Sequence, residues 1–300
     1  MEPKRGDEKY NPCSKYDHVY NCLVHNMNYV TLRADSDCTI DESTWGFSGY
    51  SGECGGRLMN KPVPKGGQVV MLFDINRRYP RAHIHRHSLQ PKDIFTATGP
   101  AEVVKLIRKI DDLTVGYPDG KTSYCNPTGK KNENYPQKKI YNNGIHIVAD
   151  NFFSSDALMD YIGAKGMGMT CTCRRDCFPA ELKPFLHHDT NTGRDPRAKV
   201  MRFEAPIVAI KQCKGDSSKN EKDYTKTLVS FQSTGATNIA GVNNLLSLSF
   251  YVSQKERGQG DAKRIWGIEQ NEARSTYINH YHAIDQADHM IKNTANRYIT

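Results

Sequence analysis

The stretch HIVADNFFSSDALMDYI, residues 146–162, joins a short apolar run to an amphipathic helical pattern through a polar turn. Ser154 or Ser155 is suited to cap the start of the helix, because a hydroxyl there can accept a backbone N–H. The helical spacing predicts a buried face made by Ala157, Leu158, Tyr161 and Ile162. A buried strand followed at once by a helix is typical of α/β proteins, so this stretch predicts an α/β fold.

The apolar run ends in a carboxylate, Asp150. A buried, unpaired carboxylate is costly, so such an acid needs a cation, a hydrogen-bonding partner or an open cleft. Asp150 has a plain alternative role as a helix cap or a loop acid. Whether it takes part in chemistry therefore depends on which other acids lie near it in the folded chain.

Three further acids are candidates. Asp41 lies in the strand-like segment CTIDESTWGF, residues 38–47, while Asp285 and Asp288 are three residues apart in a helical stretch and share one helix face. The alternatives to a catalytic role are that Asp41 is a charge at a strand edge and that Asp285 and Asp288 belong to a solvated helix face. Carboxylates that cluster need cations, and Mg²⁺ prefers carboxylate, water and phosphate oxygens. If the four acids converge, they predict a two-metal site for phosphodiester chemistry.

The rest of the chain supplies further elements of both kinds. Period-two patterns predict strands over residues 66–75, 79–87 and 166–175, and helical spacing predicts helices over residues 20–27, 100–110 and from about 271 to the C-terminus. Residues 111–142 read as a long loop, and residues 179–270 change to strand-like pieces between charged turns. The order of these elements is an α/β pattern.

Composition narrows the functional classes. The 300 residues carry 41 basic and 33 acidic side chains, a formal charge of +8 that favours a polyanionic partner. No run approaches the roughly eighteen apolar residues of a membrane span, and the first residues have no signal-peptide core, which predicts a soluble intracellular protein. The nine irregularly spaced cysteines favour thiols over a disulfide framework.

Four blocks of the sequence, in order, resemble the catalytic blocks of piggyBac-type transposases. The first runs from TIDESTWGF through the KP and KxG positions to RAHIH, and the second is IVADNFFSSDALMDYI with its DNFF. TCTCRRDCFP is similar to the strand that follows, and YINHYHAIDQADHMI is similar to the block with two acids three residues apart. The resemblance covers about residues 30–290, and four ordered blocks are far more specific than one DNFF alone.

The resemblance implies an RNase H-like core in residues 31–178, completed by a catalytic helix in residues 271–300 and interrupted by a mostly β insertion domain in residues 179–270. Residues 1–30 would be a polar segment with one helix. Asp41, Asp150 and Asp285 would be the metal-binding triad for two Mg²⁺ or Mn²⁺ ions, with Asp288 as the fourth catalytic acid. The family cuts double-stranded DNA at transposon ends and inserts at TTAA, which implies a nuclear protein and a possible homodimer.

The chain also departs from the family. HAI at residues 282–284 replaces the usual glycine pair, most of the N-terminal region is missing, and the chain stops at Thr300, before the family's Cys-rich zinc module. These departures predict a catalytic-domain fragment or a transposable-element-derived protein. The main alternative is a catalytically inactive, domesticated DNA-binding or scaffold protein, and a further one is an RNase H-like nuclease unrelated to transposition.

Basic and sulfur-containing side chains supply the remaining candidates. Those expected to contact DNA phosphates, or else to act as surface charge, are Lys61, Lys65, Arg77, Arg78, Arg174 and Arg175, together with Arg81 and Arg86. His83, His85 and His87 alternate and are expected on a solvent- or DNA-facing strand. Cys171, Cys173 and Cys177 allow a zinc site, but their spacing favours ordinary thiols.

Overall fold

The computed structural model describes residues 19, 22–23, 37–46, 56–57, 65–76, 78–86, 98–115, 145–173, 207–232, 236–244, 250–257 and 264–288. The fold is mixed α/β, as the sequence predicts. Two compact units make up the chain: the first contains Met1–Asn142 and His282–Thr300, and the second contains Asn143–Tyr281. Most of the helix predicted at 20–27 and of the loop predicted at 111–142 lies outside the described residues.

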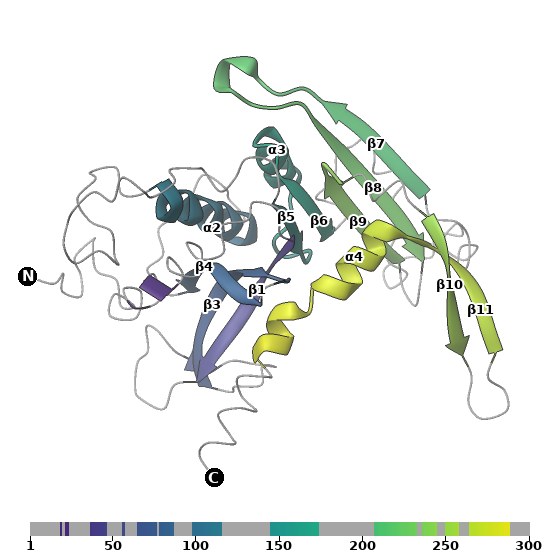
Figure 1. Ribbon diagram of the computed structural model, residues 1–300, viewed down its shortest axis with the longest axis horizontal. Coiled ribbons are helices and arrows are strands. Elements are labelled where there is room, and N and C mark those ends of the chain that lie inside the picture. Colours follow the sequence, from purple (N-terminus) through teal and green to yellow (C-terminus); the bar gives the residue numbers. More distant parts are fainter. Residues whose placement is uncertain are drawn as a thin grey trace, which may run out of the picture. The chain divides into compact units, whose positions relative to one another are not determined.

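The first unit contains an antiparallel meander (Figure 1). Strand β1 (Asp37–Gly46) pairs with β3 (Lys65–Asp74), which pairs with β4 (Tyr79–Arg86) and with the short β2 (Gly56–Arg57). The tight turn between β3 and β4 includes Arg78 at a φ of 58°. The predicted strands at 38–47, 66–75 and 79–87 are therefore confirmed, and the second and third form a hairpin.

Helix α2 (Thr98–Val115) packs its apolar face on this meander. The helix contacts β3 and β4. Its buried residues follow helical spacing, and they are Val103, Val104, Leu106 and Ile107. Lys109 donates a hydrogen bond to the carbonyl of His83 at 2.9 Å, which joins the helix to β4. The helix predicted over residues 100–110 is confirmed and extends beyond both predicted ends.

The second unit contains the predicted strand, helix and strand. β5 (His146–Ala149) and β6 (Gly168–Thr172) pair in parallel, with α3 (Asp156–Ala164) between them in the chain. The hydroxyl of Ser155 accepts the N–H of Leu158 at 3.1 Å, so Ser155 is the helix cap. Parallel strands need a crossover of this kind, and the helix supplies it.

The buried face of α3 differs in part from the prediction. Leu158 and Ile162 are buried as expected, but Met159 and Gly163 complete the face, while Ala157 is exposed and Tyr161 half-buried. Gly163 is required because a Cβ there would lie 2.5 Å from Cδ2 of Tyr224, on a neighbouring strand. A close approach of this kind is set by the packing partner, which helical spacing alone does not reveal.

Three later strands extend the sheet of β5 and β6. β9 (Ala236–Val242) pairs antiparallel with β6, β8 (Tyr224–Gln232) with β9, and β7 (Ile207–Cys213) with β8 (Figure 1). The strand-like character predicted for residues 179–270 is thus present in their described part. The structure does not show these strands as a separate insertion domain.

Ion pairs hold α3 to β8. The buried ammonium of Lys226 contacts Asp156 at 2.6 Å and also pairs with Asp160, while the hydroxyl of Tyr224 donates to Asp160 at 2.5 Å. Burial lowers the pKa of Lys226, but the two carboxylates outweigh it and raise that pKa overall.

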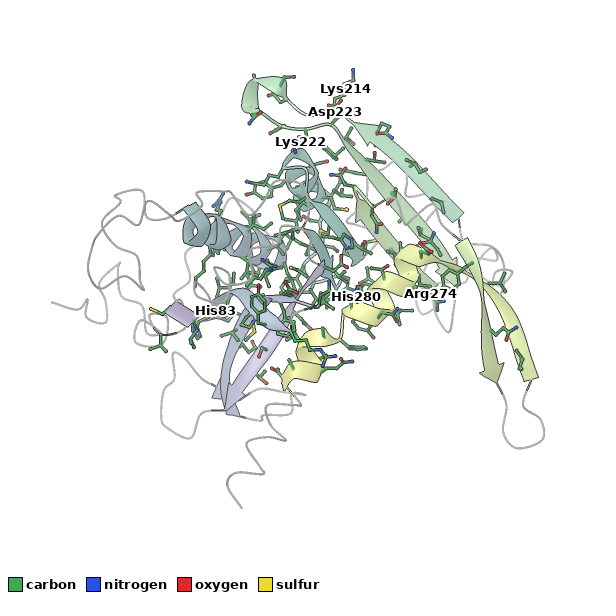
Figure 2. The ribbon with its side chains drawn as sticks, viewed as in Figure 1. His83, Lys214, Lys222, Asp223, Arg274 and His280 are labelled. Atoms are coloured by element: carbon green, nitrogen blue, oxygen red, sulfur yellow. The ribbon has the colours of Figure 1, made fainter. Side chains whose placement is uncertain are left out.

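The loop between β7 and β8 contains a short 3₁₀ turn (Ser217–Lys219), and Figure 2 shows Lys214, Lys222 and Asp223 beside it.

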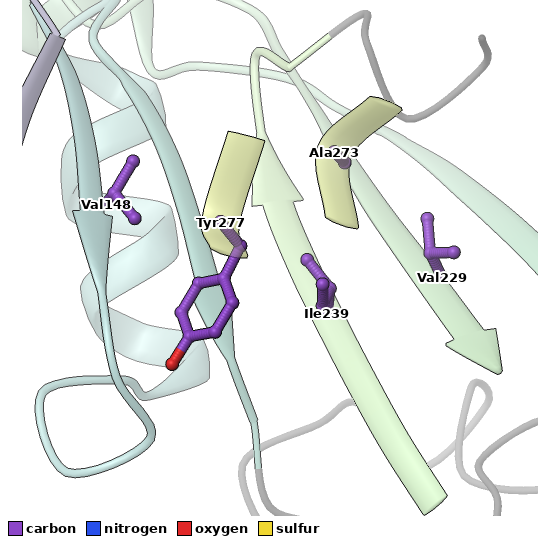
Figure 3. Close-up of a cluster of buried hydrophobic side chains, with 5 residues drawn as sticks. All are labelled: Val148, Val229, Ile239, Ala273 and Tyr277. Carbon is purple, nitrogen blue, oxygen red and sulfur yellow. The ribbon is translucent and has the colours of Figure 1, made fainter. Parts of the chain in front are cut away.

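A hairpin and a helix complete the second unit. β10 (Phe250–Arg257) and β11 (Arg264–Asn271) form a two-stranded sheet, and α4 (Glu272–His280) follows directly, capped by Asn271. Ala273 and Tyr277 of α4 are buried in one cluster with Val148, Val229 and Ile239 (Figure 3). α4 therefore covers β5, β8 and β9 with its apolar side.

The predicted C-terminal helix is interrupted. α4 ends at His280, Tyr281 and His282 form a turn, and residues 283–288 are helical again. The ring of Tyr281 stacks on that of Tyr277, with centroids 4.7 Å apart, so both side chains lie on one face of the helix. No helix in the described part of the chain is long and apolar enough to cross a membrane.

Candidate active-site acids

Asp41 lies in the middle of β1, where its side chain is half-buried. Its Oδ1 accepts the N–H of Glu42 at 2.7 Å. Because side chains alternate along a strand, Asp41 and Ser43 face one side of β1 and Glu42 faces the other. The two sides have different partners in the first unit.

On the side of Ser43, β1 is hydrogen-bonded to the C-terminal helical segment. The hydroxyl of Ser43 donates to Oδ1 of Asp288 at 2.6 Å, and the N–H of Thr44 donates to Oδ2 of Asp288 at 3.2 Å. Ser43 and Asp288 are 245 residues apart in the sequence, and both belong to the first unit. The structure thus brings one predicted acid, Asp288, to the strand that carries another, Asp41.

Asp285 lies one helical turn before Asp288. Its side chain is 48% exposed, and its Oδ2 is 3.7 Å from Nδ1 of His282. The N–H of Gln286 bonds the carbonyl of His282 at 2.9 Å, which shows that the helical backbone resumes across Asp285. Asp285 therefore has a helical backbone and an accessible carboxylate.

Asp150 belongs to the second unit and directly follows β5. Its Oδ1 accepts the N–H of Phe152 at 2.8 Å, so this oxygen stabilises the turn into α3, as a loop acid would. The turn places Phe153 in the core and leaves Phe152 41% exposed. One of the two carboxylate oxygens of Asp150 therefore has the structural role of a loop acid, which is the alternative to a catalytic role.

The carboxylate of Asp150 also affects the pKa of Tyr277. Burial of the phenol is the main cause that raises the pKa of Tyr277 to about 12, and the carboxylate of Asp150 adds to the increase, against a hydrogen bond from Thr172. Helix α4 therefore brings a tyrosine within electrostatic reach of this acid, inside the second unit.

Among the described residues, no three His, Cys, Asp or Glu side chains form a group that could hold a metal ion. Carboxylates are nevertheless the ligand type that Mg²⁺ takes. The triad of Asp41, Asp150 and Asp285 stays a prediction.

The side of β1 that carries Glu42 faces an ion triad that the sequence did not reveal. Arg86 of β4 donates from Nε and one terminal nitrogen to both oxygens of Glu102, each at 2.7 Å, and its other terminal nitrogen donates to Glu42. Burial lowers the pKa of Arg86, but the two carboxylates outweigh it and raise that pKa well above its usual value. Arg86 thereby joins β1, β4 and α2.

Two arginines expected at a DNA surface are internal instead. Arg81 is fully buried and donates from Nε and a terminal nitrogen to Oδ2 of the equally buried Asp74, at 3.0 and 2.7 Å. Arg86 is engaged by the ion triad described above. The expectation that these two contact phosphates was wrong, because acids of the neighbouring strands and of α2 bind their guanidinium groups.

The expectation that the alternating histidines lie on a solvent- or DNA-facing strand was also wrong for the two that the structure describes, His83 and His85. His83 is fully buried, His85 is 7% exposed, and their rings meet edge to face at 5.4 Å. Both side chains are therefore buried, and they do not lie on a solvent-facing side of β4. His87 lies outside the described residues.

The other candidates are only partly described. Arg78 is exposed, and Lys65 begins β3, whereas Lys61, Arg77, Arg174 and Arg175 lie outside the described residues. Their contact with DNA stays a prediction. Cys171 and Cys173 are buried, and the thiol of Cys173 donates to the carbonyl of Asn238 at 3.4 Å, while Cys177 lies outside the described part of the chain.

Comparisons with known proteins add little to these observations. No protein-family model matches the chain, and no curated protein matches it either. Among solved structures, it is similar to a chain from the cryo-EM structure of a piggyBac transposase synaptic complex with hairpin DNA, with a TM-score of 0.48 and 14% sequence identity. The match covers 86% of this chain and 40% of that chain.

Proposed function

We propose that this chain is a transposase-derived catalytic domain of the piggyBac type, which cuts and joins DNA strands at transposon ends with a TTAA-type target. The observation that carries the proposal lies in the first unit. There, the helical segment that contains Asp285 and Asp288 is hydrogen-bonded to β1, the strand of Asp41. A strand that carries one candidate acid is thus joined to a late helical segment that carries two others, and this arrangement suits a carboxylate metal site.

In this proposal Asp41, Asp150 and Asp285 hold two Mg²⁺ or Mn²⁺ ions. The ions supply Lewis-acid activation of the attacking and leaving oxygens of a phosphodiester. The chain's own task is to orient the three carboxylates, and no protein nucleophile is needed. Asp150 retains one oxygen for this task, because its turn uses the other.

The element order supports an RNase H-like core for the proposal. A three-strand meander is followed by a helix, a strand, a helix and a further strand, and β7–β9 are the strands of the proposed insertion. Double-stranded DNA would be bound through phosphate contacts, with Lys61, Lys65, Arg77, Arg78, Arg174 and Arg175 as the proposed side chains. A nuclear location and a homodimer are proposed from the DNA substrate and the resemblance alone.

One observation favours a second candidate, an inactive DNA-binding or scaffold protein derived from a transposase. Oδ1 of Asp150 is bonded to the backbone of its own turn, which is the role of a structural acid. In that case, DNA binding would persist without cleavage.

Cleavage of a labelled duplex containing TTAA, in Mg²⁺ or Mn²⁺, tests the proposal. We expect Asp150→Ala to abolish cleavage, while Asp223→Ala, which removes an exposed loop acid of the same unit, leaves it unchanged. Equal cleavage by the wild type and Asp150→Ala would contradict the assignment. DNA binding by both proteins with cleavage by neither would favour the inactive candidate.

A further inference from the structure

Both carboxylate oxygens of Asp288 are engaged by β1. Oδ1 accepts from the hydroxyl of Ser43 at 2.6 Å, and Oδ2 accepts from the backbone N–H of Thr44 at 3.2 Å. Hydrogen bonds to an ionised acceptor are shorter and stronger than neutral ones, and the Ser43 bond has the expected length. Ser43 is 5% exposed, so water competes weakly for this bond.

The position of this contact relates two other acids. Ser43 is two residues after Asp41, so both side chains leave β1 on the same side. Asp285 is three residues before Asp288, so both leave the helical segment on the same face. The contact between Ser43 and Asp288 therefore turns the face of Asp285 toward the side of β1 that carries Asp41.

The other side of β1 is held independently. Glu42 pairs with Arg86, which also binds the buried carboxylate of Glu102 on α2. The backbone of β1 at Asp41 thus has an ion pair on one side and the Asp288 contacts on the other. Loss of the Asp288 contacts would release the helical segment and leave the strand in place.

We propose that Ser43, the N–H of Thr44 and Asp288 form a clamp that positions Asp285 beside Asp41, and that Asp288 acts as a positioning residue rather than a metal ligand. This inference rests on the proposed metal-dependent function and assigns a role within it. Ser43 and Thr44 become functional residues because they hold the helix, without touching DNA or metal.

Substitutions of Asp288 distinguish a positioning residue from a metal ligand. A serine hydroxyl both donates and accepts, so an asparagine at position 288 can accept from Thr44 through Oδ1 and donate to Ser43 through Nδ2. An alanine there can do neither. Asparagine replaces the carboxylate by a neutral amide, whose oxygen is a weaker metal ligand, so Asp288→Asn keeps the clamp and weakens any bond to a metal.

Hydrogen exchange of the whole chain, followed by mass spectrometry in metal-free buffer, tests the clamp itself. Ser43→Ala should accelerate exchange in residues 283–288 about tenfold or more, since it removes a charge-assisted bond, and Ser43→Thr should restore protection. Thr44→Ala is the matched control, because the donor of Thr44 is its backbone N–H and survives the change. Unchanged exchange in Ser43→Ala would overturn the proposal.

Cleavage of the TTAA duplex by the same variants tests the positioning role. We expect the rates to fall in the order wild type, Asp288→Asn, Asp288→Ala, and Ser43→Ala to lose activity about as Asp288→Ala does. Asp288→Asn as inactive as Asp41→Ala would show that Asp288 acts through its charge and would overturn the proposal. Faster exchange in Ser43→Ala with wild-type cleavage would overturn it as well. If the wild type does not cleave, the proposed function fails, and exchange alone decides whether the clamp exists.

Discussion

Replacing Arg86 by methionine tests the ion triad beside Asp41. The guanidinium is 20% exposed and binds Glu102, which is 1% exposed, and Glu42, which is 22% exposed. Methionine fills a similar volume but leaves two carboxylates facing each other in a poorly hydrated space. Removing one partner of a buried ion pair costs about 3–5 kcal/mol, because the remaining charge loses both water and partner.

The expected loss lies at the lower end of this range. Glu42 reaches solvent and can be hydrated again, so the cost comes mainly from Glu102, and we expect about 3 kcal/mol. Urea unfolding has a slope of about 1–3 kcal/mol/M for small proteins, so the midpoint should fall by roughly 1.5 M. Such a loss is a large part of the roughly 5–15 kcal/mol that stabilises a domain.

Two further variants make the measurement decisive. Arg78→Met removes the same charge from an exposed turn and should change stability by less than about 0.5 kcal/mol. Adding Glu102→Gln to Arg86→Met neutralises the buried carboxylate and should recover much of the loss. If Arg86→Met is no less stable than Arg78→Met, the triad does not hold β1, β4 and α2 together, and the reasoning is refuted.

Three other predictions concern the second unit. Lys226 has a raised pKa, so its contribution to stability is complete below its ordinary pKa of about 10.5 and is lost as the pH rises further; urea unfolding of Lys226→Met should lack this decline. Tyr277 should titrate near pH 12 in metal-free buffer, and Asp150→Asn should lower the pKa of Tyr277 because a negative charge is removed. Tyrosine-ring NMR would follow the titration, and the Tyr277→Phe variant would identify the Tyr277 signal. An unchanged pKa would show that the carboxylate of Asp150 does not act on Tyr277. Gly163→Ala should cost about 1–3 kcal/mol in thermal or urea unfolding, since the new Cβ would overlap the ring of Tyr224, and a neutral result would mean that the ring moves aside.

The sequence by itself predicted the local elements. Alternation along β1, β3 and β4, helical spacing in α2, and the strand, turn and cap at residues 146–162 all depend on neighbours within a few positions. The cap was narrowed to two serines, and the structure selects Ser155. Two local predictions failed in part: the C-terminal helix is interrupted at Tyr281 and His282, and the buried face of α3 includes Gly163, which packs against Tyr224 from a strand far along the chain.

Tertiary structure alone decided the partners of the charged side chains. Arg81 and Arg86 read as surface cations in the sequence, and only strand pairing brings Asp74 and Glu42 to them. Likewise, no local pattern could relate Ser43 to Asp288, which lies 245 residues later. Local periodicity reports which face of an element is apolar, whereas the fate of a charge depends on which elements pack together, and that choice is made by the whole chain when it folds.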